Sequence, residues 1–177
     1  MEKTSLIMML LPVVFVIHEY EEIIMFRRWI DRNREELRKR FPKIESFFTR
    51  RGNLDYSTAS FAVGTFHEFI LITIVSCYSV WSGAYQWWFG ALIGYSVHLL
   101  MHIVQWIVYR KYVPVIITSF LTLPYCIYAF AEFSKVTTLS GLQLFLWAVI
   151  GIVLTILSLF SAFFFMDRFQ RWEKGNK

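Results

Sequence analysis

The chain has 177 residues, of which 56% are hydrophobic, 19% aromatic and 18% charged, with a formal net charge of +5. Soluble globular domains have about 45–50% apolar and about 25% charged residues, so this composition argues against a soluble domain. The apolar excess predicts an all-α fold, a polytopic transmembrane helix bundle that forms a single membrane domain over residues 1–177.

Five apolar stretches are long enough to cross a hydrocarbon core of about 30 Å at 1.5 Å per residue. They cover residues 6–26, 59–80, 87–109, 113–133 and 142–165. The first stretch has no small-x-small cleavage site after it, so we expect a retained span rather than a signal peptide. The sequence therefore predicts about five spans.

Residues 27–51, between the first two spans, form a strongly basic segment with ten Lys and Arg residues against four acidic ones. Their apolar residues recur at helical spacing, which predicts an amphipathic helix on the cytoplasmic surface, broken by Pro42 into two short pieces. We expect this segment to contact the anionic head groups of the inner leaflet. We expect one of two roles for it. It is either a solvated loop that sets the membrane topology or a segment that takes a direct part in binding an anionic substrate.

Sixteen of the eighteen Lys and Arg residues fall on one side of a five-span topology. They lie within residues 27–51, at Arg110 and Lys111, and at Arg168, Arg171, Lys174 and Lys177; Lys3 and Lys135 lie on the other side. The positive-inside rule then places the N-terminus outside and the C-terminus in the cytoplasm, in a multi-pass protein of the cytoplasmic membrane. Membrane lipids, and not nucleic acid, are the expected partners.

The four histidines of the chain, His18, His67, His98 and His102, all lie inside predicted spans. At 1.5 Å per residue, His18 and His67 are each about 12 Å from the cytoplasmic boundary, and His98 and His102 about 16 and 10 Å. The i, i+4 spacing of His98 and His102, and of His18 and Glu22, places each pair on one helix face. We therefore predict a polar cluster, contributed by three helices and turned away from lipid.

Such a cluster suits a divalent metal ion, because imidazole and carboxylate groups are the usual ligands of zinc and iron in proteins. The predicted ligands are His18, Glu22, His67, His98 and His102. Zinc is favoured, and a di-iron centre would use more carboxylates. A metal-free hydrogen-bonded network or proton relay is the alternative.

Three further glutamates lie near these ligands in the sequence. Glu21 is the first choice of general base and Glu68 the second, since either carboxylate can take a proton from a metal-bound water. Glu19 is expected to support a ring nitrogen or to face a different helix. Tyr95 and Gln105 share the helix face of the histidine pair and could line the same cavity, but ordinary packing or an interhelical hydrogen bond is the favoured interpretation of each.

The string HEYEE, residues 18–22, fits the pattern H-x-x-E-E. In a small polytopic protein with a histidine-glutamate pair, His67 and Glu68, in the second span and HxxxH in the third, it resembles the HXXEE family of small prokaryotic integral membrane proteins. The resemblance covers the first three spans and implies that His18, Glu21 and Glu22 are functional positions. It implies no reaction and no substrate.

Two other motif families fit less well. A zincin HExxH motif would need a second histidine where Glu22 stands. The order of motifs is also similar to that of the glutamyl intramembrane proteases, with EExxxR, FxxxH and HxxxN. However, Arg27 is one place too far from the glutamate pair, no phenylalanine stands four residues before His67, and His102 replaces the asparagine.

The sequence as a whole predicts a membrane-embedded metal-dependent enzyme, a hydrolase acting on a lipid or other amphiphilic substrate reached from the cytoplasmic leaflet. A di-iron oxidoreductase is the second choice of enzyme. The alternatives are a proton-coupled transporter or channel that uses the same cluster, an intramembrane protease resembling the glutamyl type, and a signalling or scaffold protein.

Overall fold

The computed structural model describes residues 2–175, so Lys177, counted above among the basic residues, lies outside the described part. The helices are α1 (Lys3–Arg40), α2 (Pro42–Arg50), the 3₁₀ turn η1 (Asn53–Asp55), α3 (Thr58–Ser82), α4 (Tyr85–Tyr109), α5 (Ile116–Val136) and α6 (Gly141–Gly175). Residues 2–175 contain no strand. The prediction of an all-α fold is confirmed.

Four helices, α3, α4, α5 and α6, are long and apolar enough to cross a membrane. Each begins and ends within a few residues of a predicted span, except that α6 continues to Gly175. The predicted first span lies in α1, which is not one of the four. The chain is therefore a membrane protein with transmembrane helices, and the count of five spans stays a prediction.

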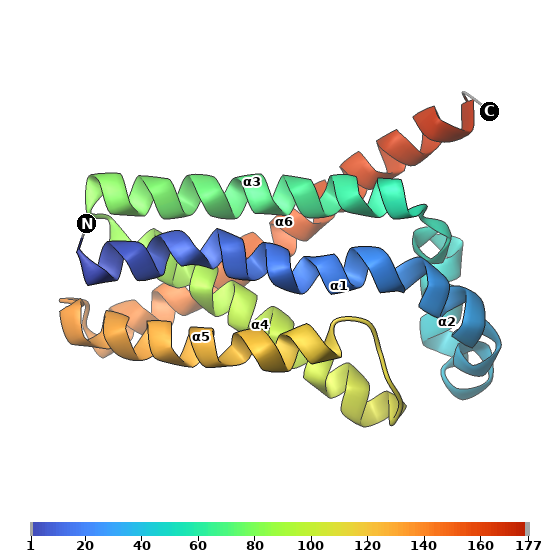
Figure 1. Cartoon of the computed structure of the whole chain (residues 1–177), viewed down its shortest axis with the longest axis horizontal. Helices are drawn as coiled ribbons and strands as arrows, with labels where there is room; N and C mark the ends of the chain where they lie inside the picture. The colour runs from blue at the N-terminus through green and yellow to red at the C-terminus, as the bar shows by residue number, and fades with distance from the viewer. Residues whose placement is uncertain (1, 176–177) are drawn as a thin grey trace.

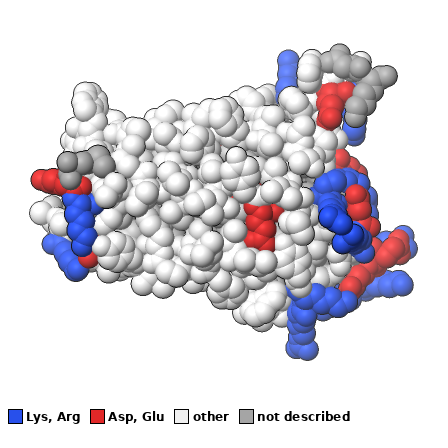
Figure 2. Space-filling view, in the orientation of Figure 1, with Lys and Arg blue, Asp and Glu red and all other residues white. Residues whose placement is uncertain are grey.

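The helices form two layers (Figure 1). In the front layer α1 lies between α3 and α5, and behind it α4 and α6 cross each other. The end of α1, α2, the α4–α5 loop and the C-terminal part of α6 lie together at one end of the bundle, which we call the basic end. Figure 2 shows the charged residues gathered at the two ends, with an acidic patch on the otherwise uncharged middle of this face.

The first helix continues well beyond its predicted end near Phe26. Charged residues such as Glu, Lys and Arg favour helix, so a change from apolar to charged sequence does not stop one. Ion pairs one turn apart, Arg27 with Asp31 and Arg40 with Glu36, support this part of α1. The helix ends only at the predicted break, where Pro42 occupies the first turn of α2.

A second proline, Pro12, lies inside α1 and cannot donate a hydrogen bond to the carbonyl of Met8. The buried indole of Trp88 on α4 donates to that carbonyl instead, at 3.1 Å. Tyr125 on α5 likewise donates to the carbonyl of Ile7 at 2.8 Å. The neighbouring helices thus satisfy the freed backbone and fix how the first half of α1 is rotated in the bundle.

Glycines allow α4 and α6 to cross in close contact. A Cβ atom added to Gly151 would lie 2.6 Å from the Cα and carbonyl carbon of Gly90 and closer still to its oxygen. A Cβ on Gly94 would meet the Thr155 hydroxyl. Small residues at such crossings let helix backbones approach closely in a membrane, and this crossing supports α4, which carries the histidine pair.

A candidate metal centre between the first and fourth helices

Three histidine rings meet where α1 passes α4. The ring centroid of His18 lies 5.3 Å from that of His98 and 5.4 Å from that of His102, and the two α4 rings are 4.5 Å apart. His18 is fully buried and His102 nearly so. The helix repeat explains the α4 pair, because residues four apart share a face.

The spacing of the ring nitrogens fits a bound cation. One ring nitrogen from each of the three histidines lies within 4.8 Å of the others. The Nε2 atoms of His98 and His102 are 3.1 Å apart, and two nitrogens bound tetrahedrally to zinc at about 2.0–2.1 Å would be about 3.3 Å apart. The Nε2 atom of His18 is buried without a hydrogen-bond partner among the described residues. A buried polar atom left unpaired is costly, and a metal ion would satisfy it.

Two glutamates of α1 extend this group. Ligand atoms of Glu19, Glu22 and His98 also lie within 4.8 Å of one another, so His98 belongs to both groups. The Oε1 atom of Glu19 is 3.4 Å from Nε2 of His98. Three imidazoles and two carboxylates therefore converge. We call them the His/Glu cluster: His18, Glu19, Glu22, His98 and His102.

Side chains of α3 and α4 contact the cluster and orient it. Thr65 on α3 donates to Oε2 of Glu19 at 3.3 Å. Oε1 of Gln105, on the same helix α4, accepts a hydrogen bond from Nδ1 of His102 at 3.0 Å. The ring of Tyr95 lies edge-on to His18, and its hydroxyl donates to Thr122 on α5. Contacts of this kind fix the ring orientation and tautomer of metal-binding histidines.

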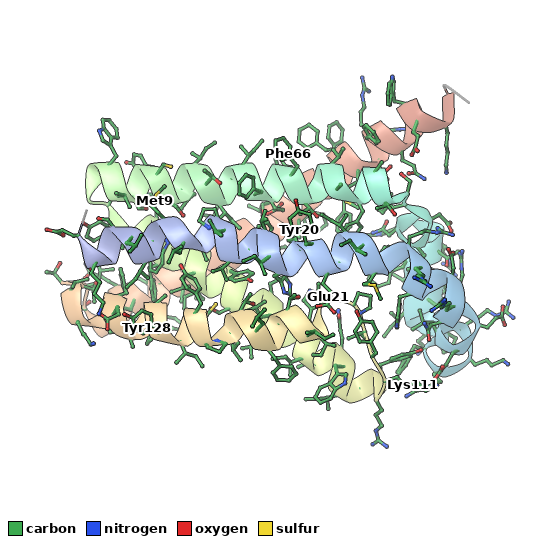
Figure 3. All side chains as sticks on the ribbon, viewed as in Figure 1. Met9, Tyr20, Glu21, Phe66, Lys111 and Tyr128 are labelled. Carbon is green, nitrogen blue, oxygen red and sulfur yellow. The ribbon has the colours of Figure 1, made fainter. Side chains whose placement is uncertain are left out.

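Glu21, the first choice of general base, lies outside both groups. Its Oε1 accepts from the Tyr112 hydroxyl at 2.7 Å, and its Oε2 accepts from the backbone N–H and hydroxyl of Thr118 at 2.8 and 2.7 Å. Burial and the bond to Glu21 raise the pKa of Tyr112, which stays a neutral donor. Figure 3 labels Glu21 where α1 faces the start of α5.

These bonds secure a strained turn. Val115, the residue before α5, has φ 68°, a left-handed conformation that β-branched residues rarely adopt. Such strain costs about 1–3 kcal/mol and persists only where the surroundings hold it. Glu21 holds the first turn of α5 through Thr118, so the structure gives this carboxylate a scaffolding contact.

We expect Glu21→Ala to lower the free energy of unfolding by roughly 1.5–3 kcal/mol, the usual value of a hydrogen bond to a charged group, and to leave bound metal in place. Thermal unfolding in detergent and elemental analysis of the same sample measure both effects. Glu22→Ala is the matched control and should lose metal. A folded Glu21→Ala protein without metal would contradict this assignment.

His67, a predicted ligand, is not brought into the cluster. Its Nε2 lies 2.7 Å from the Ser161 hydroxyl on α6, and its ring packs 4.9 Å from that of Phe165. His67 follows Gly64 by three residues, and a side chain at Gly64 would meet Met166 of α6. The face of α3 that carries His67 therefore turns towards α6, while Thr65 reaches α1.

Glu68 lies at the edge of the cluster. One of its oxygens accepts from the Ser158 hydroxyl at 2.8 Å, whereas Oε1 is buried with no hydrogen-bond partner in the described chain. It is close enough to Glu19 and His98 for electrostatic interaction with both. Of the two predicted bases, Glu68 is thus the one with a free carboxylate oxygen.

Glu19 was not among the predicted ligands, and its spacing does not single it out. Residues 19 and 22 are three apart, and residues 18 and 22 four apart, so Glu22 lies between His18 and Glu19 on the helix surface. Glu21 lies on the far side of His18. Glu19 and Glu21 therefore flank the stripe of His18 and Glu22 at equal angles, and helix spacing alone does not choose between them.

Comparison with known proteins adds one finding. A family model described as "Protein of unknown function with HXXEE motif" matches residues 9–129. The chain belongs to the HXXEE family. No curated protein and no solved structure matches the chain.

The HXXEE match runs from α1 into α5 and includes every residue of the His/Glu cluster. The three defining positions of the motif, His18, Glu21 and Glu22, have two kinds of contact. His18 and Glu22 belong to the cluster, and Glu21 bonds to Tyr112 and Thr118. The HXXEE motif thus joins a candidate metal site to the turn that starts α5.

Proposed function

We propose that this HXXEE protein is a membrane-embedded, metal-dependent hydrolase that acts on a lipid or another amphiphile reached from the cytoplasmic leaflet. The observation that carries the proposal is the convergence of three imidazoles and two carboxylates in one buried cluster, with Nε2 of His18 left unpaired among the described residues. Buried unpaired polar atoms are retained where a function or a ligand requires them.

The donor set favours zinc as the metal. Three nitrogen and two oxygen ligands suit zinc, and a catalytic zinc site commonly uses three protein ligands and leaves a position for water. Iron is the second choice, because Glu19 and Glu22 raise the share of carboxylates above that of a histidine-only site.

Side chains of this protein would then accept the proton and keep the ligands in orientation. A bound divalent ion supplies hydroxide by lowering the pKa of its water towards 7. Glu68 would be the proton acceptor for such a water through its unpaired Oε1, since the oxygens of Glu21 are occupied. Thr65 and Gln105 hold Glu19 and His102 in orientation.

We further propose that α1 is a fifth span, with the N-terminus outside and the C-terminus in the cytoplasm. In support, the segments with most Lys and Arg lie at the basic end (Figures 1 and 2). At the other end Lys3 and Lys135 are both paired with Glu132. The positive-inside rule assigns the more basic end to the cytoplasm.

The proposal predicts that protein purified in detergent retains about one equivalent or more of a transition metal through dialysis, as measured by elemental analysis. It also predicts hydrolysis of an amphiphilic substrate at a rate that Glu68→Gln lowers by about 100-fold or more, the usual range for loss of a general base. That variant should keep its metal. Metal-free protein, or full activity in Glu68→Gln, would contradict the proposal.

One observation favours a second function, proton transport. A continuous chain of polar contacts links Gln105, His102, His98, Glu19 and Thr65 across α4, α1 and α3. Chains of histidines and acidic groups inside a membrane form proton paths in pumps and transporters. A metal-free protein that produces pH-dependent flux in liposomes would support this function over hydrolysis.

A further inference from the structure

A cavity of about 240 Å³ opens at the basic end, between α1 and the α4–α5 loop. Arg28 and Arg32 of α1 and Lys111 of the loop supply its charge, and Met25, Trp29 and Tyr112 its apolar and aromatic walls. We call it the basic pocket. Figure 3 labels Lys111 and Glu21 on the side where α1 and this loop meet.

The two arginines of the pocket have no partner among residues 2–175. Neither Arg28 nor Arg32 makes a hydrogen bond or ion pair with any residue in the described range. They are four residues apart on α1, and like charges at this spacing repel each other. Other arginines of the same helix are paired, as Arg34 is with Asp55 at 2.8 Å. The pocket therefore concentrates positive charge that the chain does not neutralise.

The other polar groups of the pocket are occupied. The Trp29 indole donates to the carbonyl of Tyr112 at 2.8 Å, the Tyr112 hydroxyl donates to Glu21, and Lys111 donates to Glu36. Among the described residues that line the pocket, the two guanidinium groups are the charged groups that make no hydrogen bond to the protein. The planar guanidinium group binds phosphate through two parallel hydrogen bonds, which makes it the preferred side chain for phosphate recognition.

Part of the pocket lies on the same helix face as the cluster, whereas Arg28, seven residues after Glu21, lies on the side of Glu21. Met25 and Trp29 continue the stripe of His18 and Glu22 with spacings of three and four residues. At 1.5 Å per residue, Arg28 is about 9 Å along α1 from Glu22 and Arg32 about 15 Å. An anionic group held here would be at the level of the lipid head groups, with the rest of the molecule directed along the stripe towards the cluster.

We propose that the basic pocket binds the phosphate group of an anionic membrane phospholipid. Trp29 and Tyr112 suit this position, because aromatic residues with polar edges concentrate at the membrane interface. The pocket would hold the head group of the substrate while the cluster acts on a bond deeper in the molecule. This last role rests on the proposed function, whereas the binding itself does not.

The test uses the full chain in a neutral detergent and follows the 1:1 lipid complex by native mass spectrometry. The ligands are short-chain phosphatidylglycerol, phosphatidylcholine of the same chain length, and inorganic phosphate. The variant is Arg28→Gln with Arg32→Gln. Its matched control, Arg168→Gln with Arg171→Gln, removes the same charge from exposed positions on α6 at the same end.

Wild type should prefer phosphatidylglycerol to phosphatidylcholine. The pocket variant should bind phosphatidylglycerol at least about tenfold more weakly, since each basic residue near a membrane surface contributes about 1 kcal/mol, and the control should stay within about twofold. Equal weakening in both variants, or in neither, would overturn the proposal. Tight binding of inorganic phosphate that the pocket variant loses would overturn the lipid assignment in favour of free phosphate.

Metal content, measured on the same samples, separates this proposal from the preceding one. The pocket variant should keep its metal, because Arg28 and Arg32 make no contact with the cluster. Wild-type protein without metal that still shows the lipid preference would overturn the proposed function and support the lipid site. Metal-bound protein without that preference would overturn the lipid site alone.

Discussion

His98→Ala should remove the metal that the proposed function requires. His98 belongs to both groups of potential ligands, with its Nε2 3.1 Å from that of His102 and 3.4 Å from Oε1 of Glu19. Loss of an outer-shell partner of a metal ligand typically costs 10- to 100-fold in affinity. Loss of a shared ligand should cost more than about 100-fold, so metal that survives dialysis in wild type should be absent from the variant.

His67→Ala is the matched control for this experiment, since it removes the same ring from a neighbouring helix. His67 bonds to Ser161 and stands outside both groups, so its variant should keep the metal content of wild type. Elemental analysis of the three proteins, purified side by side, measures the difference. Equal loss of metal from the two variants would contradict the assignment of His98, and not His67, to the His/Glu cluster.

The second large effect concerns the crossing of α4 and α6. We expect Gly151→Ala to lower the free energy of unfolding by about 1–3 kcal/mol or more, the usual cost of overpacking. The added Cβ would meet the backbone of Gly90, which cannot rotate away as a side chain can. The helices would have to separate, and α4 carries both His98 and His102, so metal affinity should fall as well.

Gly141→Ala provides the control, because a Cβ at Gly141 meets no atom within 4 Å. Alanine favours helix by about 1 kcal/mol over glycine, so this variant should be at least as stable as wild type. Thermal unfolding in detergent, followed by tryptophan fluorescence, compares the two. Equal transition temperatures for the two variants would show that α4 and α6 do not pack as closely as described.

The helices were largely predictable from the sequence because their signals are local. Apolar runs of sufficient length, bounded by glycine, proline and charged residues, predicted α3, α4 and α5 within a few residues. The break at Pro42 was predicted, but the continuity of the first span with the basic segment in one helix was not, because the change to charged residues after Phe26 does not break a helix. The backbone stops being helical only at Phe41, before Pro42.

The candidate site was predictable in part. Spacings of four residues are fixed by the chain itself, and both such pairs, His98 with His102 and His18 with Glu22, belong to the cluster. Depth along a span also follows from residue number, and His67 was placed at the level of the others on that basis. The direction in which the His67 side chain points does not follow from residue number, and its ring hydrogen-bonds to Ser161 on α6 instead.

The sequence by itself determined which side chains share a face of one helix, because the 3.6-residue repeat is a property of the backbone. Tertiary structure alone decided which faces meet. Each helix can rotate about its axis without changing its own hydrogen bonds, so the rotation is set by packing between helices, such as Trp88 on the Met8 carbonyl and Gly64 against Met166. That packing brought Glu19 to His98 and turned Glu21 towards α5.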